Sequence, residues 1–148
     1  MSQFSEITSR SQGIVNNMGY FDYHILGCGA IGSSTATQLA RMGASRLYLY
    51  DMDKVEIENV GVSRYYISDI GKTKVDALEI QLLSINPEIN ITKHRGRFRR
   101  FNKSLSDKDI VILGFDNMAS RLMAAEEALK GKSKPHALID GRMGAEHY

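Results

Sequence analysis

The sequence has one cysteine, no long apolar run and little net charge, and each of these excludes a class of protein. The single cysteine, Cys28, permits no internal disulfide, and no cysteine or histidine spacing resembles a zinc site. No apolar stretch approaches the roughly 20 residues that span a bilayer, so we expect no membrane partner. The opening MSQFSEITSR is too polar for a signal peptide, which makes the cytoplasm the expected location. A net charge of +2 does not by itself indicate nucleic-acid binding.

The length and composition predict one globular domain. A chain of 148 residues buries about 70% of its unfolded surface, and its 43% hydrophobic and 24% charged residues are ordinary for a folded protein. We expect residues 1–20 to form an N-terminal arm. Residues 21–148 are then the domain itself.

The stretch Tyr23–Asp53 carries the first functional signal. Tyr23–Leu26 favours a strand, and Gly27–Gly32, GCGAIG, has glycine spacing that suits a tight turn and close approach of a phosphate. A helix that starts there directs its unpaired N–H groups and positive dipole end back at the loop. Asp51 follows at a distance where a carboxylate can accept hydrogen bonds from a ribose. These residues predict a nucleotide site and leave NAD, FAD, S-adenosylmethionine and ATP open.

Hydrophobic periodicity predicts the other elements. Buried or half-buried strands are expected at 47–50, 89–92, 110–113 and 137–139. Helices are expected from the glycine loop to Gly43, from Lys74 to Ile85 behind a Thr73 cap, and after Asp116-Asn117 with an apolar face of Met118, Leu122, Ala125 and Leu129. Residues 55–71 show no period and predict an irregular connection. This alternation predicts an α/β fold, a Rossmann-like doubly wound and mostly parallel sheet with helices on both faces.

Several motifs follow the glycine loop in a fixed order. They are DMDKVEIENV at 51–60, Arg64, DIGKTKVDAL at 69–78, INPEI at 85–89 and ILGFDNMASR at 112–121. In this order they resemble the adenylation domain of the ThiF/MoeB/HesA superfamily, the bacterial relatives of ubiquitin-activating enzymes. The resemblance runs from about Tyr23 to Arg121. It implies a homodimer that binds ATP and Mg²⁺ and adenylates the C-terminal glycine carboxylate of a ubiquitin-like or sulfur-carrier protein.

The resemblance also implies roles for individual residues. Asp51 would hold the ribose, Lys74 would contact the α-phosphate, and Asp116 would hold Mg²⁺. Asn59 and Arg64 would take the remaining phosphate oxygens, and Arg10 would reach the nucleotide of the partner subunit. The residues expected at the nucleotide are Gly27, Gly29, Ala30, Ile31, Gly32, Asp51, Asp53, Asn59, Lys74, Asp116 and Asn117.

Simpler interpretations remain open for these residues. Asp51 and Asp53 also suit a solvated strand end, Lys74 suits an exposed helix position, and Asp116-Asn117 suits a helix cap that binds nothing. The family usually spaces its asparagine and arginine as N-L-x-R. Here the arginine is displaced to Arg64 behind Asn59-Val60-Gly61-Val62-Ser63, which puts its role in doubt.

A basic run, KHRGRFRR at 93–100, is the strongest local concentration of charge. A nucleic-acid patch is one interpretation. A solvated strand exit or a docking surface for an acidic partner is favoured, because no RNA- or DNA-binding motif surrounds the run. We expect all four histidines to be structural or at the surface, and Cys28 to serve packing in the turn.

Two departures from the family shape the functional hypotheses. The chain has no cysteine downstream of the fifth strand and no CxxC pair, and it stops at GRMGAEHY, where the domain is expected to continue. The leading hypothesis is an ATP- and Mg-dependent adenylyltransferase of the ThiF type. One alternative is a short relative that binds a nucleotide or a partner without turnover. A second is an NAD(P)-dependent oxidoreductase, which would leave Lys74, Asn59 and Asp116 without a role.

Overall fold

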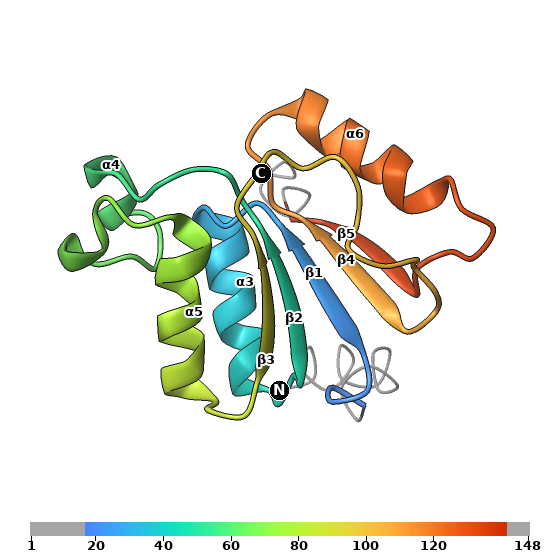
Figure 1. Cartoon of the computed structure of the whole chain (residues 1–148), viewed down its shortest axis with the longest axis horizontal. Helices are drawn as coiled ribbons and strands as arrows, with labels where there is room; N and C mark the ends of the chain where they lie inside the picture. The colour runs from blue at the N-terminus through green and yellow to red at the C-terminus, as the bar shows by residue number, and fades with distance from the viewer. Residues whose placement is uncertain (1–16, 142–148) are drawn as a thin grey trace, which may run out of the picture.

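The computed structural model describes residues 17–141 and contains a five-stranded, entirely parallel sheet (Figure 1). Its strands are β1 (Asp22–Leu26), β2 (Arg46–Tyr50), β3 (Asn90–His94), β4 (Asp109–Leu113) and β5 (Ala137–Asp140). The strand order is β3-β2-β1-β4-β5, so the chain winds outward in one direction and then returns to the other side of β1. This is the doubly wound sheet that the sequence predicts.

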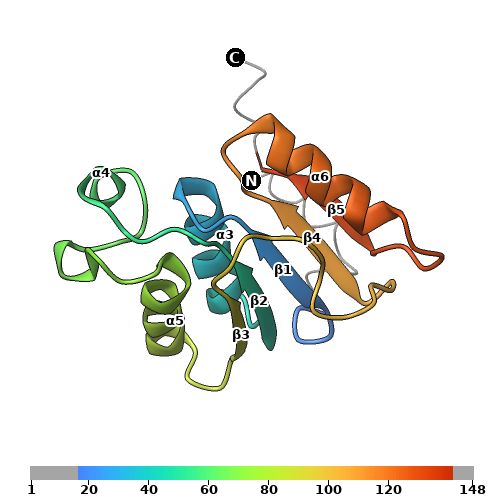
Figure 2. The same cartoon turned by 45° about the horizontal axis from the view of Figure 1, so that its top comes forward.

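Helices cover both faces of the sheet. The helical segments are α3 (Ala30–Arg41), α4 (Ile57–Val60), the 3-10 turn η1 (Ile67–Asp69), α5 (Lys74–Ile85) and α6 (Met118–Leu129). α3 and α5 pack side by side on one face, whereas α6 lies alone on the other (Figures 1 and 2). No helix of residues 17–141 is long and apolar enough to cross a membrane.

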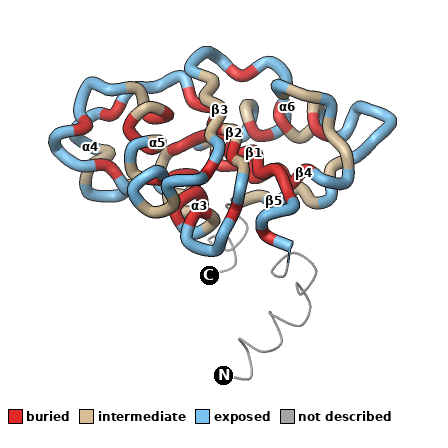
Figure 3. Tube along the Cα trace, turned by 60° about the horizontal axis from the view of Figure 1, so that its bottom comes forward, coloured by how far each residue is buried: buried red, intermediate tan, exposed pale blue. Residues whose placement is uncertain are grey.

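Alternate residues of each central strand enter two separate hydrophobic cores. In β1, Tyr23 and Ile25 belong to the core under α3 and α5, while Leu26 belongs to the core under α6. β4 divides in the same way, with Ile110 and Ile112 on one side and Val111 and Leu113 on the other. Strands buried on both faces explain why these segments read as continuous apolar runs. Figure 3 shows the buried strands enclosed by exposed helix surfaces and loops.

The predicted helix boundaries are confirmed by their caps. Gly43 has φ of +99° and its N–H donates to Ala40 O at 3.3 Å, while Ala44 N–H donates to Leu39 O at 3.0 Å, the paired bonds of a Schellman motif. The Thr73 hydroxyl accepts from the Asp76 amide at 3.2 Å. The Asn117 side chain accepts from the Ser120 amide at 2.7 Å.

Two local predictions were wrong. Residues 55–71 are not wholly irregular, because α4 and η1 each make a short helical turn there. The predicted apolar face of α6 does not face the core: Met118, Leu122 and Leu129 are exposed, whereas Ala124 and Ala128 are buried. The inward side of α6 also buries Arg121, which pairs with Asp140 on β5, and periodicity alone does not reveal which side of a helix is inward. Of the predicted N-terminal arm, residues 1–16 lie outside the described residues, and Met18 packs into the core beneath α3.

Candidate nucleotide-binding site

A cavity of about 570 Å³ opens at the carboxyl ends of β1, β2, β3 and β4. It lies where the strand order reverses, because β1 leads through α3 to β2 on one side while β4 lies on the other. Ligands of open α/β sheets bind at this switch point. The lining residues are Gly27, Gly29, Tyr50, Asp51, Met52, Asp53, Lys74, Gly96, Arg97, Phe98, Gly114, Phe115, Asp116, Asn117, Ala119, Ser120 and Met123.

The glycine loop between β1 and α3 forms the floor of the cavity. Gly27 has φ of +98°, a left-handed conformation that favours glycine. A Cβ added at Gly32 would lie 1.7 Å from the Gly27 carbonyl oxygen, so the first turn of α3 packs directly on the loop. Gly29 is the N-cap of α3 and supplies no side-chain cap, which leaves the first N–H groups of the helix available to a ligand.

The Asp51 carboxylate is held in place by the backbone on both sides of it. One oxygen accepts from the Cys28 amide at 2.7 Å, and the other accepts from the Asp53 amide at 2.8 Å. Burial raises the pKa of Asp51, and the two amide hydrogen bonds and the charge of Lys74 partly offset this rise. Each carboxylate oxygen retains a second lone pair, so Asp51 can still accept a hydrogen bond from a hydroxyl group in the cavity.

Lys74 places a positive charge at the cavity on a side chain that is almost wholly buried. It is the first residue of α5, its amide donates to Asp53 O at 2.9 Å, and only 7% of the residue is exposed. Its ammonium makes no hydrogen bond or ion pair with any of residues 17–141. Lysine is rarely buried without a partner. The alternative interpretation of Lys74 as an exposed helix lysine is therefore wrong.

Asp116 follows β4 and faces the glycine loop across the cavity. Its Oδ1 would lie 3.9 Å from a Cβ added at Gly29, and its carboxylate makes no hydrogen bond or ion pair with another described residue. Asn117 caps α6 while it lines the cavity. No group of three or more His, Cys, Asp or Glu side chains within residues 17–141 could hold a metal ion. A divalent cation at Asp116 would therefore need phosphate and water oxygens as its other ligands, the usual arrangement for Mg²⁺.

The remaining predicted residues do not line this cavity. Asn59 accepts from the Glu56 amide at 2.7 Å within α4, and Arg64 Nη2 lies 3.4 Å from Ser34 Oγ on α3. Arg64 lines a separate cavity between α3, α5 and residues 60–72. Ala30, Ile31 and Gly32 form the first turn of α3, directly behind the cavity floor. Arg10 lies outside the described residues.

The segment after β3 contributes a wall that sequence reasoning missed. Gly96, Arg97 and Phe98 line the cavity, although the basic run that contains them suggested only a solvated exit or a docking surface. Their position directly after a parallel strand could have predicted this placement, because the carboxyl ends of parallel strands lie at the same edge of the sheet. The earlier residues of the run are neutralised internally: Lys93 lies 2.9 Å and Arg95 lies 2.7 Å from Asp76.

Cys28 is a packing residue, as predicted. Its side chain is fully buried in the core beneath α3, and its carbonyl accepts from the Tyr65 hydroxyl at 2.5 Å. Burial, with the nearby Asp51 charge, raises the pKa of the Cys28 thiol well above its usual value. The histidines within residues 17–141 do not line the cavity, and His24 is fully buried in the sheet.

Known proteins resemble this chain in sequence and in fold. Residues 4–141 match the ThiF family. The chain belongs to the ThiF family. Ubiquitin-like modifier-activating enzyme 5 of Arabidopsis thaliana is 36% identical over 138 residues, and that of Branchiostoma floridae is 33% identical over 130. These alignments cover 78% and 76% of this chain but 32% of each relative, so this ThiF chain spans about a third of their length.

Solved structures of Escherichia coli proteins have the same fold as this ThiF chain. MccB with ATP is 25% identical, has a TM-score of 0.62, and is matched over 72% of this chain and 33% of its own. TcdA, a tRNA N6-threonylcarbamoyladenosine dehydratase, in complex with AMP, is 21% identical with a TM-score of 0.72. That match covers 90% of this chain and 55% of TcdA and concerns the fold alone.

Proposed function

We propose that this chain binds Mg-ATP in the cavity and adenylates the C-terminal carboxylate of a ubiquitin-like or sulfur-carrier protein. The observation that carries the proposal is Lys74, a largely buried residue of the cavity whose ammonium makes no hydrogen bond or ion pair with any of residues 17–141, although its charge acts on the Asp51 carboxylate. A largely buried ammonium that lacks hydrogen-bond acceptors is costly, and the oxygens of a bound phosphate would supply them.

The arrangement of charges suits adenylyl transfer. A carboxylate is already an adequate nucleophile toward the α-phosphorus, so the reaction needs compensation of the charge on the phosphates more than it needs a strong base. Lys74 would supply part of this compensation at the N-terminus of α5, where the helix dipole adds to it. Asp116, which has no partner among the described residues, fits a Mg²⁺ ion that neutralises phosphate oxygens. Asp51 would orient the ribose.

The relatives support this assignment of the ligand. MccB has been solved with ATP and with MccA. Activation of a ubiquitin-like modifier is the function named for the Arabidopsis and Branchiostoma relatives. The homodimer, the cytoplasmic location and the role of Arg10 stay predictions from the family resemblance.

A comparison of ligands by thermal unfolding tests the proposal. The protein is melted with Mg-ATP, with ATP and EDTA, and with NAD⁺. A ligand at a hundred times its dissociation constant adds about 2.7 kcal/mol to the free energy of unfolding. We expect stabilisation by ATP that depends on magnesium, and pyrophosphate exchange into ATP once a carrier protein is added. Stabilisation by NAD⁺ alone would overturn the proposal. Magnesium-dependent ATP binding without exchange would indicate a nucleotide-binding relative that lacks turnover.

A further inference from the structure

Tyr65 is a buried tyrosine that contacts the glycine loop without lining the nucleotide cavity. It lies between β2 and α5 and is 2% exposed. Its hydroxyl donates to the Cys28 carbonyl at 2.5 Å and lies 3.4 Å from the Lys74 carbonyl. Burial raises the pKa of Tyr65 well above its usual value, so the hydroxyl keeps its proton. A carbonyl can only accept, and the hydroxyl has one proton, so the shorter contact, to Cys28, is the hydrogen bond.

This hydrogen bond sets the direction of the peptide group between Cys28 and Gly29. No peptide bond of residues 17–141 is cis, so the C=O and the N–H of this group point in opposite directions. Gly29 lines the nucleotide cavity, whereas Tyr65 lines the separate cavity between α3, α5 and residues 60–72. The bond to Tyr65 therefore turns the Cys28 oxygen away from the nucleotide cavity and the Gly29 N–H toward it. That N–H makes no hydrogen bond to another of residues 17–141, so it is available to an anion.

The peptide group would not keep this direction without the tyrosine hydroxyl. Cys28 is fully buried, and its carbonyl would be left there without a hydrogen bond, which is costly. Rotation of the group would bring the oxygen into the cavity, where water can hydrate it. Glycine at position 29 permits the rotation, because it adopts positive φ without strain. Asp51 does not prevent it, since its carboxylate holds the preceding peptide group through the Cys28 amide.

We propose that Tyr65 is a positioning residue for the phosphate site, whose hydroxyl fixes the Cys28–Gly29 peptide so that the Gly29 N–H donates to a phosphate oxygen of the ligand. The inference rests on the proposed function, because it concerns the same cavity. Tyr65 touches no ligand and acts through the backbone of the loop. A donor whose direction is fixed in advance stabilises phosphate charge without reorganisation, whereas the rotated peptide would present an oxygen to the phosphate and repel it.

The sequence allows this one peptide group to be observed by itself. Cys28 is the single cysteine of the chain, and glycine follows it. Protein labelled with ¹³C-carbonyl cysteine and ¹⁵N-glycine therefore gives a single signal in an NMR spectrum that correlates each amide with the preceding carbonyl. The signal is recorded with and without inorganic triphosphate, which has phosphate oxygens but no nucleoside. Calorimetry on the same samples measures binding of Mg-ATP, triphosphate and adenosine.

The variant is Tyr65→Phe, which removes the hydroxyl and keeps the ring. Tyr23→Phe is the matched control: Tyr23 is 1% exposed in the same core, and its hydroxyl donates to the Met18 carbonyl at 3.2 Å, outside the nucleotide cavity. Each variant loses one hydrogen bond from a buried hydroxyl to a carbonyl, so both lose stability. Only Tyr65→Phe should change the binding of phosphate.

We expect triphosphate to shift the Gly29 amide signal of the wild type, and Tyr65→Phe to move the Cys28 carbonyl signal before ligand is added. Tyr65→Phe should weaken binding of Mg-ATP and triphosphate about tenfold or more, because it removes a hydrogen bond to a charged group. Its affinity for adenosine should stay unchanged, and Tyr23→Phe should bind all three ligands normally.

Three results would overturn the role of Tyr65. They are a normal Mg-ATP affinity of Tyr65→Phe, an equal loss of Mg-ATP and adenosine binding, and a Gly29 signal that triphosphate leaves in place. The last is measured on the wild type, so the proposal stays testable even if Tyr65→Phe does not fold. A wild-type chain that binds triphosphate with a shift of the Gly29 signal, but does not bind Mg-ATP, would overturn the proposed function and support the role of Tyr65.

Discussion

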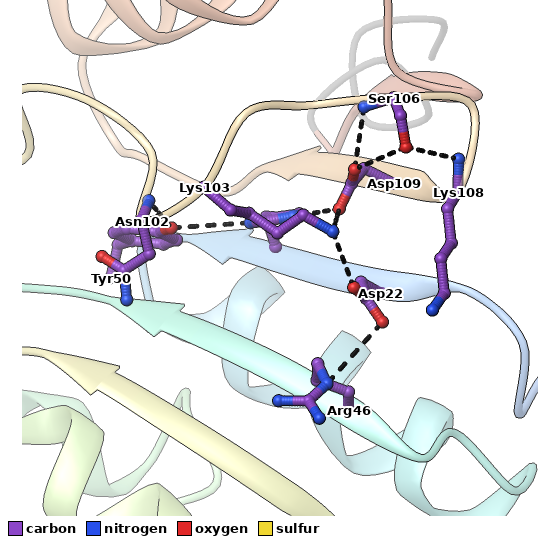
Figure 4. A network of polar contacts seen from close by, with 9 residues as sticks. Asp22, Arg46, Tyr50, Asn102, Lys103, Ser106, Lys108 and Asp109 are labelled. Carbon is purple, nitrogen blue, oxygen red and sulfur yellow. Dashed lines mark hydrogen bonds and ion pairs between the residues drawn. The ribbon is translucent and has the colours of Figure 1, made fainter.

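His24 on β1 and Asp109 at the start of β4 form a hydrogen bond of 2.8 Å between side chains that are both fully buried. Lys103 lies 3.0 Å from the same Asp109 oxygen and 2.8 Å from Asp22 (Figure 4). The Ser106 amide donates to the other Asp109 oxygen at 2.9 Å. The network joins the amino ends of β1 and β4, whereas the nucleotide cavity lies at their carboxyl ends. It stabilises the strand pair that forms the switch point, and it reaches the site through His24, whose Nδ1 lies 3.5 Å from the hydroxyl of Tyr50, a residue that lines the cavity.

This network predicts a loss of stability in acid. Burial opposes ionisation of Asp109, but hydrogen bonds from His24, Ser106 and Lys103 outweigh it and lower the pKa of Asp109. A lowered folded-state pKa stabilises the protein above the unfolded-state pKa of about 3.9, and that contribution is lost as the pH falls through the folded-state pKa. Asp109→Asn should cost about 3 kcal/mol at pH 7 and less in acid. Denaturant unfolding between pH 7 and pH 2 measures this. Asp107→Asn, an exposed neighbour, is the control, and parallel pH curves for Asp109→Asn and the wild type would contradict the assignment.

Lys74→Met should weaken ATP binding roughly 10- to 100-fold, because a charged hydrogen bond to phosphate contributes about 1.5–3 kcal/mol. The melting temperature of the free protein should change little, because the variant removes a desolvated charge but also removes the charge that offsets the burial of Asp51. Calorimetry with ATP and thermal unfolding measure the two effects. Lys72→Met changes a lysine two residues earlier whose side chain lies outside the cavity. Equal ATP affinities of the Lys74 and Lys72 variants would remove Lys74 from the phosphate site.

Asp116→Ala should abolish magnesium-dependent pyrophosphate exchange and leave the fold intact. The carboxylate is exposed and contacts no other described residue through a hydrogen bond or ion pair, so its loss costs little stability. ATP binding should become insensitive to magnesium, which calorimetry with and without EDTA measures. Unchanged exchange would exclude Asp116 as the metal ligand.

Gly32→Ala should destabilise the glycine loop. The added Cβ would lie 1.7 Å from Gly27 O and 3.3 Å from Ile25 Cγ2, so the first turn of α3 must move away from the loop. We expect a loss of about 3 kcal/mol or more from overpacking, together with weaker ATP binding. Gly61→Ala is the matched control, because a Cβ there meets no atom within 4 Å. Denaturant unfolding of both variants tests this, and equal stabilities would show that the loop tolerates a side chain at Gly32.

Local chemistry made much of the fold predictable. The caps at Gly43, Thr73 and Asn117 bond to groups only a few residues away in the chain. The sequence alone is therefore enough to predict them. Continuous apolar runs such as 110–113 required a strand covered on both faces, and β4 is buried throughout. Asp51 was predicted at a nucleotide site from its place after a strand, and Lys74 and Asp116 were predicted there from the family motifs; all three line the cavity.

The rest depended on contacts between segments distant in the chain. Which side of α6 faces inward is decided across the sheet, where Ala124 and Ala128 pack and Arg121 pairs with Asp140 of β5, while Leu122 stays exposed. Arg97 joins the cavity only because β3 lies in the same sheet as β1 and β4, and Arg64 is kept away from it beside Ser34. The order of residues alone thus specifies the elements, their ends and a nucleotide loop, since these arise from neighbouring residues. Only the folded chain decides which charges share a cavity and which apolar side chains face outward, because those outcomes arise from packing across the sheet.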